Sequence, residues 1–386
     1  MKHFFRVLLL VLWFVHVLQA DTLDSIRKTL VDKNAAPETA ALFYNLQRLA
    51  AEGKTLLGQQ DPNFTAEGQQ GISDIKAITG KELAVWGHDF MDISQGTLPN
   101  APNRDEVQRI AERQAAQSLE YTIKAYEEGI ANIFCWHMRA PEPLAFYARE
   151  LSNEQKKTMF RSLLPGGNHH EWYKERLKTI ADFAAKAKIK DGTLVPIIFR
   201  PFHEFDGDWF WWGQAYCTPQ EFIDCWRFTV KYLRDELGVR NFLYAFSPDN
   251  RFSSEEKFLE RYPGNDFVDI VGFDNYADFE TRRIDAAAKK LKIVSDYAVK
   301  HGKVAALTEV GYRRSPIPSE LYTDYYGRAL ADPSLQIAFF MFWRQSAEIP
   351  YVPTLESPLR DNFMEFINSP RMVLLPDVGN LYALPK

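Results

Sequence analysis

Two glutamates, Glu204 and Glu309, combine a residue type and a placement that suit acid–base chemistry. Each follows a short apolar run, and these runs are the fourth and the seventh of eight along the chain. Hydrolysis of a glycosidic bond needs such a pair, because one carboxylic acid protonates the leaving oxygen while the other attacks the anomeric carbon or activates water. The acid requires a raised pKa, and the nucleophile must stay ionised. We therefore expect the two side chains to share one site.

Four residues at the ends of apolar runs can donate a hydrogen bond or a positive charge to a carboxylate. They are Arg200, His203, Tyr276 and Arg344. Such donors favour the ionised form and would suit the nucleophile. A purely structural interpretation stays open at this point, in which both glutamates only form ion pairs with Arg200 and Arg344.

Residues 206–213, directly after Glu204, contain Trp209, Trp211 and Trp212 between two glycines. This spacing keeps neither a helical nor a strand period, so the three rings cannot all face one core. Sugar rings stack their apolar C–H faces on flat aromatic side chains. We expect Trp209 to be exposed for such stacking and the other two rings to pack at the barrel edge.

The elements that must position these residues appear as eight short β-rich runs separated by helix-like segments. Near-continuous apolar runs of this kind are typical of parallel strands buried on both faces. The runs cover residues 55–58, 83–86, 133–136, 194–199, 242–246, 268–273, 304–307 and 337–342. Helical spacing predicts helices over residues 105–129, 218–237 and 284–301. Capping boxes are expected at Thr218 with Glu221 and at Ser253 with Glu256.

Alternation of strand and helix over eight cycles predicts the α/β class, as a (β/α)8 TIM barrel in a single catalytic domain. A doubly wound open sheet is the main rival, but the chain lacks the G-x-G-x-x-G turn that such a sheet normally carries. The chemistry of a barrel lies just beyond the carboxyl ends of its strands. Polar or ionisable residues do follow every run, at 59–61, 87–89, 137–139, 200–204, 247–249, 274–276, 308–312 and 343–345.

These segments resemble one known family. Residues 200–204 with 209–213 resemble the acid/base segment of glycoside hydrolase family 26, and residues 308–312 resemble its nucleophile segment. Residues 136–137, 274–276 and 342–344 are similar to its substrate-binding strand ends. The resemblance implies a barrel that cleaves β-1,4-mannosidic bonds with retention, with Glu204 as acid/base and Glu309 as nucleophile.

The resemblance also implies residues that bind substrate around the cleaved bond, with Tyr276 orienting the nucleophile. Its implied partner is a polysaccharide or oligosaccharide, namely mannan, glucomannan or galactomannan, and it implies no metal and no cofactor. Arg200 is expected to join this set, which otherwise comprises His137, His203, Trp209, Asp274, Tyr276, Trp343 and Arg344. Exo-acting release of mannobiose, or action on β-1,3-xylan or mixed-linkage β-glucan, are alternatives within the same family.

Two other classes of protein compete with this interpretation. A metal-dependent barrel hydrolase would use scattered strand-end ligands such as His88, Asp89 and His137, but the chain contains no His-Glu-x-x-His motif. A chelator separates the two, because it should abolish only metal-dependent hydrolysis. An exported sugar-binding protein would use the same aromatic residues, although it has no need for an opposed pair of glutamates.

The first twenty residues are expected to be a signal peptide rather than part of the fold. Lys2 and Arg6 precede an apolar run that ends near Ala20, which is the usual order in a secretory leader. Residues 21–386 would then form the barrel domain of an exported monomer, periplasmic or secreted, with no membrane anchor after cleavage. The net charge of −5 gives no reason to expect nucleic-acid binding. Three cysteines are too few for a disulfide framework.

Overall fold

The computed structural model describes residues 22–63, 65–66, 68, 70–95, 104–346, 349 and 351–384, with only the backbone of residues 95 and 104–107. The predicted signal peptide, residues 1–20, lies outside the described residues.

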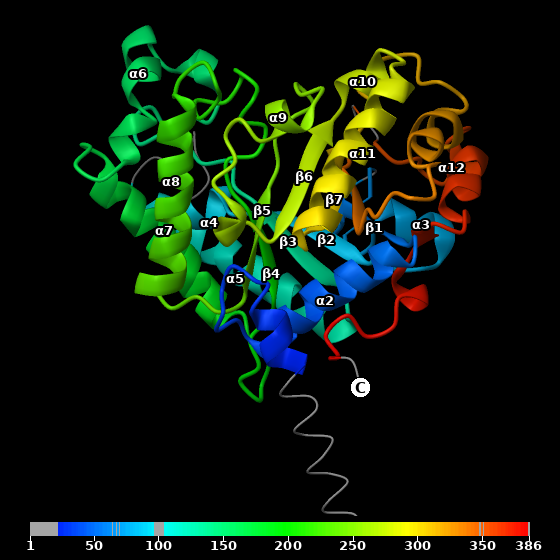
Figure 1. The fold of residues 1–386 in the computed structure, drawn as a ribbon, viewed down its shortest axis with the longest axis horizontal. Coiled ribbons are helices and arrows are strands. Elements are labelled where there is room, and N and C mark those ends of the chain that lie inside the picture. Colours follow the sequence, from blue (N-terminus) through cyan, green and yellow to red (C-terminus); the bar gives the residue numbers. More distant parts are fainter. Residues whose placement is uncertain are drawn as a thin grey trace, which may run out of the picture.

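Eight parallel strands close into a barrel, because β1 pairs with β2 on one edge and with β8 on the other. The (β/α)8 barrel expected from the sequence is thereby confirmed (Figure 1). The strands are β1 (Thr55–Gln60), β2 (Val85–Asp89), β3 (Ala131–Cys135), β4 (Ile197–Arg200), β5 (Phe242–Phe246), β6 (Ile270–Asn275), β7 (Val304–Val310) and β8 (Phe339–Phe342).

Each of the eight predicted runs overlaps one of these strands, but several strands extend further toward their carboxyl ends. β7 continues to Val310, and β6 continues to Asn275. Glu309 and Asp274 therefore lie within strands rather than in the loops beyond them. The reason is that hydrogen bonding between neighbouring strands continues past the last apolar residue, into the polar mouth of the barrel. A further short strand, β9 (Met372–Val373), pairs with the beginning of β1.

Helices surround the barrel and follow the expected order. The main ones are α2 (Pro37–Ala51), α3 (Asp74–Thr79), α4 (Met91–Gln95), α5 (Arg104–Glu128), α6 (Asn153–Thr158), α7 (His170–Lys186), α8 (Pro219–Lys231), α9 (Glu255–Phe258), α10 (Ala277–Glu280), α11 (Ile284–His301) and α12 (Arg360–Ile367). The α5 and α11 helices confirm two predicted segments, and α8 continues the third through a π-helical turn at Tyr232–Glu236. None of the helices among the described residues is both long and apolar enough to cross a membrane.

The helix caps test the predicted capping boxes separately. Thr218 and Glu221 form both bonds of the box, the Glu221 N–H donating to Thr218 Oγ1 (3.2 Å) and the Thr218 N–H to Glu221 Oε2 (2.8 Å). The box at Ser253 and Glu256 is wrong. Ser254 caps α9 instead, by accepting a hydrogen bond from the Lys257 N–H. Because Ser253 and Ser254 are adjacent, the sequence does not show which of the two serines caps the helix.

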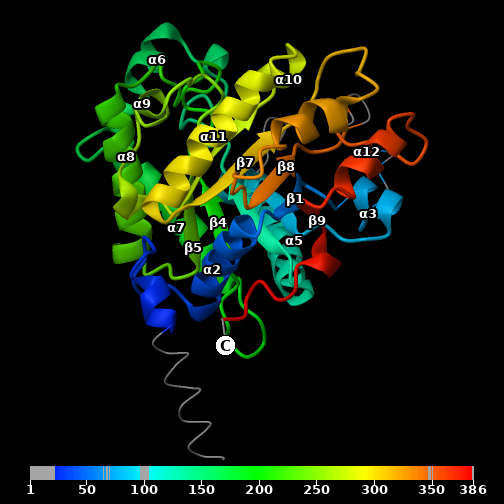
Figure 2. The same cartoon turned by 45° about the vertical axis from the view of Figure 1, so that its right-hand side comes forward.

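Two layers of buried side chains hold the barrel together. Alternate residues of each strand point inward and pack with the helix α2, which lies across the amino ends of the strands (Figures 1 and 2). The remaining strand residues pack outward against the surrounding helices. Phe199, Phe246 and Phe340 belong to this outer layer. Because side chains fill the barrel from α2 upward, the space left for a site lies at the carboxyl ends of the strands.

Candidate active site

A local irregularity in β7 places Glu309 at the mouth of the barrel. Phe273 pairs with Leu307, whereas the next residue of β6, Asp274, pairs with Glu309, so β7 carries one extra residue at Thr308. Strict alternation would turn Glu309 away from the barrel interior, and this bulge turns it back. Glu309 and Asp274 consequently share one face, together with Thr308.

Two donors hold the carboxylate of Glu309. Arg200 Nη2 donates to Oε2, and the hydroxyl of Tyr276 donates to Oε1, both at 2.7 Å. Only 6% of Glu309 is exposed. Hydrogen bonds to an ionised group are about twice as strong as neutral ones, so this arrangement stabilises the anion. Of the two arginines that the structural interpretation offered as ion-pair partners, Arg200 does pair with Glu309.

Arg200 also binds a second carboxylate. Its Nη1 donates to Asp274 Oδ2 at 2.7 Å, and Asp274 Oδ1 accepts further hydrogen bonds from Thr308 and Ser247. Burial opposes the charge of Arg200, but Asp274 and Glu309 raise its pKa above the usual value. Burial raises the pKa of Asp274 to about 7, with Arg200 acting in the opposite direction. The guanidinium thus links β4, β6 and β7 through charged hydrogen bonds.

Glu204 lies in the loop after β4 and faces these groups. Its backbone has a φ of 54°, a conformation that is uncommon for a non-glycine residue, and its N–H donates to Ser247 O (2.9 Å). Carboxyl oxygens of Glu204, Asp274 and Glu309 all lie within 4.8 Å of one another. Burial, followed by the negative charges of Glu309 and Asp274, raises the pKa of Glu204 well above its usual value. The site therefore pairs a carboxylic acid that retains its proton with a carboxylate stabilised by donors.

Trp209 lies directly against Glu204. Its indole N–H donates to Glu204 Oε2 at 2.6 Å. A Cβ atom on Gly207 would come within 2.5 Å of the ring, so the indole lies flat against that glycine. Trp209 is half-buried rather than exposed, whereas Trp211 and Trp212 are fully buried. The expectation that Trp211 and Trp212 pack is confirmed, and the expectation that Trp209 is exposed is wrong.

A chain of polar groups extends from Asp89 to the loop that carries Glu204. Asp89 Oδ2 contacts Nδ1 of His137 at 2.6 Å, and His137 Nε2 lies 3.2 Å from Nε2 of His203. Burial, together with the charges of Arg200 and His137, lowers the pKa of His203 well below its usual value, which keeps its ring neutral. Asp89 was considered only as a metal ligand, and its role as the partner of His137 was missed. Asp89 ends β2, two residues before α4, and the sequence around it carried no signal of that pairing.

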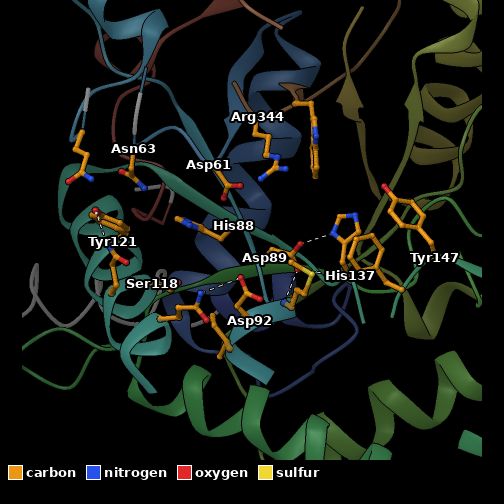
Figure 3. Close-up of a pocket in the computed structure, with 17 residues that line it drawn as sticks. Asp61, Asn63, His88, Asp89, Asp92, Ser118, Tyr121, His137, Tyr147 and Arg344 are labelled. Atoms are coloured by element: carbon orange, nitrogen blue, oxygen red, sulfur yellow. Dashed lines mark hydrogen bonds and ion pairs between the residues drawn. The ribbon is translucent and has the colours of Figure 1, made fainter. Parts of the chain in front are cut away.

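Trp343 and Arg344 follow β8, and Trp343 lies beside His137. The rings of Trp343 and His137 are 5.9 Å apart. Trp343 is half-buried and Arg344 is exposed, and both line a polar pocket next to the site (Figure 3). Of the eight predicted binding residues, Trp209 and Tyr276 hydrogen-bond to the carboxyl pair, and Arg200 and Asp274 lie beneath it. His203 precedes Glu204 in the chain and contacts His137.

Among the residues that the structure describes, two groups of side chains have the spacing of metal ligands. The first is formed by Glu204, Asp274 and Glu309, and the second by Asp89, Cys135 and His137. The first already contains a buried cation, because Arg200 bonds to two of its carboxylates. In the second, burial raises the pKa of the Cys135 thiol well above its usual value, which disfavours the thiolate that binds metals.

A closed (β/α)8 barrel with two carboxylic acids opposed at its mouth defines the class of barrel glycoside hydrolases. Residues 31–350 match the family model of glycosyl hydrolase family 26, and the chain belongs to that family.

Relatives and solved structures agree with this assignment. The chain is 36% identical over 290 residues to a mannan endo-1,4-beta-mannosidase of Bifidobacterium adolescentis, covering 72% of this chain and 27% of the relative. It is 28% identical to one of Bacillus subtilis, covering 52% and 53%. The chain thus spans about a quarter to a half of these relatives. Among solved structures, GH26C from Muricauda sp. MAR_2010_75 has a TM-score of 0.87 at 42% identity, covering 93% of this chain and 97% of that one. A Cellulomonas fimi endo-beta-1,4-mannanase double mutant has a TM-score of 0.83 at 31% identity, covering 92% and 80%.

Proposed function

We propose that the protein is an endo-acting β-mannanase that hydrolyses β-1,4-mannosidic bonds with retention of configuration. The observation that carries the proposal is the carboxyl pair of Glu204 and Glu309, whose nearest oxygens lie within 4.8 Å. Retaining enzymes hold their carboxyl groups about 5–5.5 Å apart, and inverting enzymes leave a wider gap for water. The names of the relatives support mannan as the substrate.

The proposed reaction has two steps. Glu309 attacks the anomeric carbon while Glu204 gives its proton to the leaving glycosidic oxygen, which yields a glycosyl ester on Glu309 and a free chain end. Glu204, now ionised, takes a proton from water, and the resulting hydroxide equivalent attacks the anomeric carbon and releases Glu309. The raised pKa of Glu204 supplies the proton for the first step.

The remaining residues take different roles in this proposal. His137, His203, Trp209, Tyr276, Trp343 and Arg344 contact the sugars on either side of the cleaved bond. Arg200 and Asp274 are positioning residues, because they are almost completely buried and their polar atoms bind other side chains of the site. We also propose that residues 1–20 are a leader that is cleaved on export, and that the mature protein is a monomer. N-terminal sequencing of the exported protein tests the cleavage site.

Release of reducing sugar from linear mannan tests the activity. Wild type should produce a ladder of oligosaccharides from the earliest times, as endo cleavage requires. A single disaccharide from the start would replace this mode by exo action. Hydrolysis of β-1,3-xylan or mixed-linkage β-glucan, with mannan untouched, would overturn the substrate. A chelator should leave the rate of hydrolysis unchanged. Loss of activity on adding the chelator would instead favour a metal-dependent hydrolase.

A further inference from the structure

Arg313 lies three residues beyond the end of β7 and covers one face of the Tyr276 ring. Its guanidinium carbon is 4.5 Å from the centre of that ring, inside the distance of about 6 Å at which a cation and an aromatic face attract each other. The hydroxyl of the same ring donates to Glu309 Oε1 at 2.7 Å. One phenol therefore carries a positive charge on its face and the carboxylate of the proposed nucleophile at its hydroxyl group.

Glu280 holds Arg313 in this place. Glu280 is the last residue of α10, which lies beyond the carboxyl end of β6 (Figure 1). Its Oε1 accepts hydrogen bonds from the backbone N–H (3.0 Å) and Nε (2.8 Å) of Arg313, and its Oε2 accepts one from Nη2 (3.1 Å). Paired bonds of this kind fix the plane of a guanidinium as well as its distance. Burial opposes the charge of Arg313, but the bond to Glu280 raises its pKa above the usual value, so the cation persists.

The ring of Tyr276 is also confined by its other neighbours. The ring of Tyr351 packs edge-on against it, with 6.2 Å between the two centres. A Cβ atom on Gly311 would come within 2.1 Å of Tyr351 and 2.8 Å of Tyr276, so a larger residue at 311 would displace both rings. Burial, followed by the negative charge of Glu309, raises the pKa of the Tyr276 hydroxyl well above its usual value. The hydroxyl therefore keeps its proton and serves as a donor.

A cation on the face of a phenol strengthens that donor. The positive charge draws electron density from the ring and polarises the O–H bond, and the effect grows as water is excluded. Glu280 is 7% exposed and Arg313 is 49% exposed, so the contact is partly shielded from water. The stronger hydrogen bond stabilises the carboxylate of Glu309 and fixes its orientation.

We propose that Arg313, fixed by Glu280, is a positioning residue for the nucleophile, and that its effect on Glu309 passes through the hydroxyl of Tyr276. The contact also joins two strand-end segments, because Tyr276 and Glu280 follow β6 whereas Arg313 follows β7. This inference rests on the proposed function and adds a residue to it.

Two variants of Arg313 and a matched control test this role. Arg313→Met keeps the length of the side chain and its contact with the ring but removes the charge, whereas Arg313→Lys keeps a charge. Arg328→Met is the control, because Arg328 forms an exposed ion pair with Asp285. We expect Arg313→Met to lower kcat on mannohexaose about fivefold at an unchanged KM, which corresponds to one partly desolvated cation–π contact. Arg313→Lys should lose less, the control should behave as wild type, and the melting temperature of each variant checks its folding.

The same substitution is then made in a Tyr276→Phe background, which lacks the hydroxyl group. If Arg313 acts through that hydroxyl, Arg313→Met should cause no further loss of kcat there, because residues that act in one network have non-additive effects. A fivefold loss that persists in this background would overturn the inference, and so would an unchanged kcat in the single variant. A rise in KM at constant kcat would overturn it as well, since Arg313 would then bind substrate directly.

Failure of this role and failure of the proposed function give different results. If wild type cuts mannan and the losses caused by the two substitutions are independent, the proposed function stands and the role of Arg313 falls. If wild type cuts another β-glycan, the proposed substrate fails, and the same set of variants measured on oligosaccharides of that glycan decides the role of Arg313.

Discussion

The indole N–H of Trp209 donates a hydrogen bond of 2.6 Å to Oε2 of Glu204. This bond stabilises the ionised form of the carboxyl group. Burial and the negative charges of Glu309 and Asp274 act in the opposite direction and dominate, so the pKa of Glu204 is raised. Trp209 therefore limits how far that pKa rises.

The substitution Trp209→Phe should move the alkaline limb of the activity profile to higher pH. The phenyl ring keeps most of the burial but cannot donate, so the pKa of Glu204 rises further and the acid stays protonated over a wider range. The profile of kcat/KM against pH measures this shift. Trp172→Phe, on the half-exposed surface of α7, serves as control. A limb that stays in place or moves to lower pH would contradict the role given to the hydrogen bond.

Replacement of Glu204 by alanine should lower kcat on mannan by about 10²–10⁴, the usual contribution of a general acid. The loss in the first step should be much smaller for an aryl β-mannoside with an acidic phenol, because that leaving group departs without a proton. Glu154→Ala, on the exposed surface of α6, should behave as wild type. Equal losses on both substrates would show that Glu204 does not act as the acid.

Much of the fold could be predicted from the sequence because its signals are local and repeated. Apolar runs revealed all eight strands, and the run at 242–246 matches β5 to the residue. A single site was also predictable, since the carboxyl ends of parallel strands meet at one face. The serine pair before α9 shows the limit, because two adjacent residues offered the same cap.

The orientation of Glu309 was not predictable from periodicity. It depends on the extra residue in β7 at Thr308, which is visible only in the pairing with β6. The buried positions of Arg200 and Asp274 were likewise hidden, because sequence spacing does not distinguish a side chain that contacts substrate from one beneath it. The pocket beside the site joins residues of β1, β8 and α5, and no local pattern connects them.

Removal of the Tyr276 hydroxyl should impair the nucleophile. Tyr276→Phe loses the 2.7 Å hydrogen bond to Glu309, and a bond to a charged group is worth about 1.5–3 kcal/mol. We expect kcat to fall by about 10- to 100-fold with little change in the melting temperature. Tyr44→Phe, on α2 at the far end of the barrel, is the control. A variant with full activity would remove Tyr276 from the mechanism.

The first product of mannan hydrolysis should carry the β configuration at its new reducing end. This follows from the short separation between the oxygens of Glu204 and Glu309, within 4.8 Å, because inverting enzymes hold their carboxyl groups about 6.5–9.5 Å apart to admit the attacking water. Proton NMR during the first minutes distinguishes the β anomer from the α anomer before mutarotation equilibrates them. Initial formation of the α anomer would indicate inversion and refute the double displacement.

The substitution Glu204→Gln should stabilise the protein at high pH although it removes activity. The folded-state pKa of Glu204 lies above the ordinary value of 4.5, so between these two pKa values the folded protein binds more protons than the unfolded chain. The free energy of unfolding then falls as the pH rises. The neutral amide avoids this loss. Its melting temperature should exceed that of wild type above the folded-state pKa, and the advantage should vanish below about pH 4.5, where both side chains are neutral.

A matched change at an exposed site, Glu154→Gln, should leave the melting temperature unaltered across the same pH range, because that side chain is 80% exposed. A constant difference between Glu204→Gln and wild type at all pH values would mean that shape, not charge, causes the effect.

The two ion pairs that Arg200 forms, with Asp274 and with Glu309, also constrain which substitutions this site can accept during evolution. A lysine at position 200 is a point charge without the planar fork, so it cannot reproduce both bonds at 2.7 Å. Loss of either acid would leave a buried guanidinium short of a partner. Positions 200, 274 and 309 are therefore expected to change together, because a substitution at one of them requires compensating substitutions at the others.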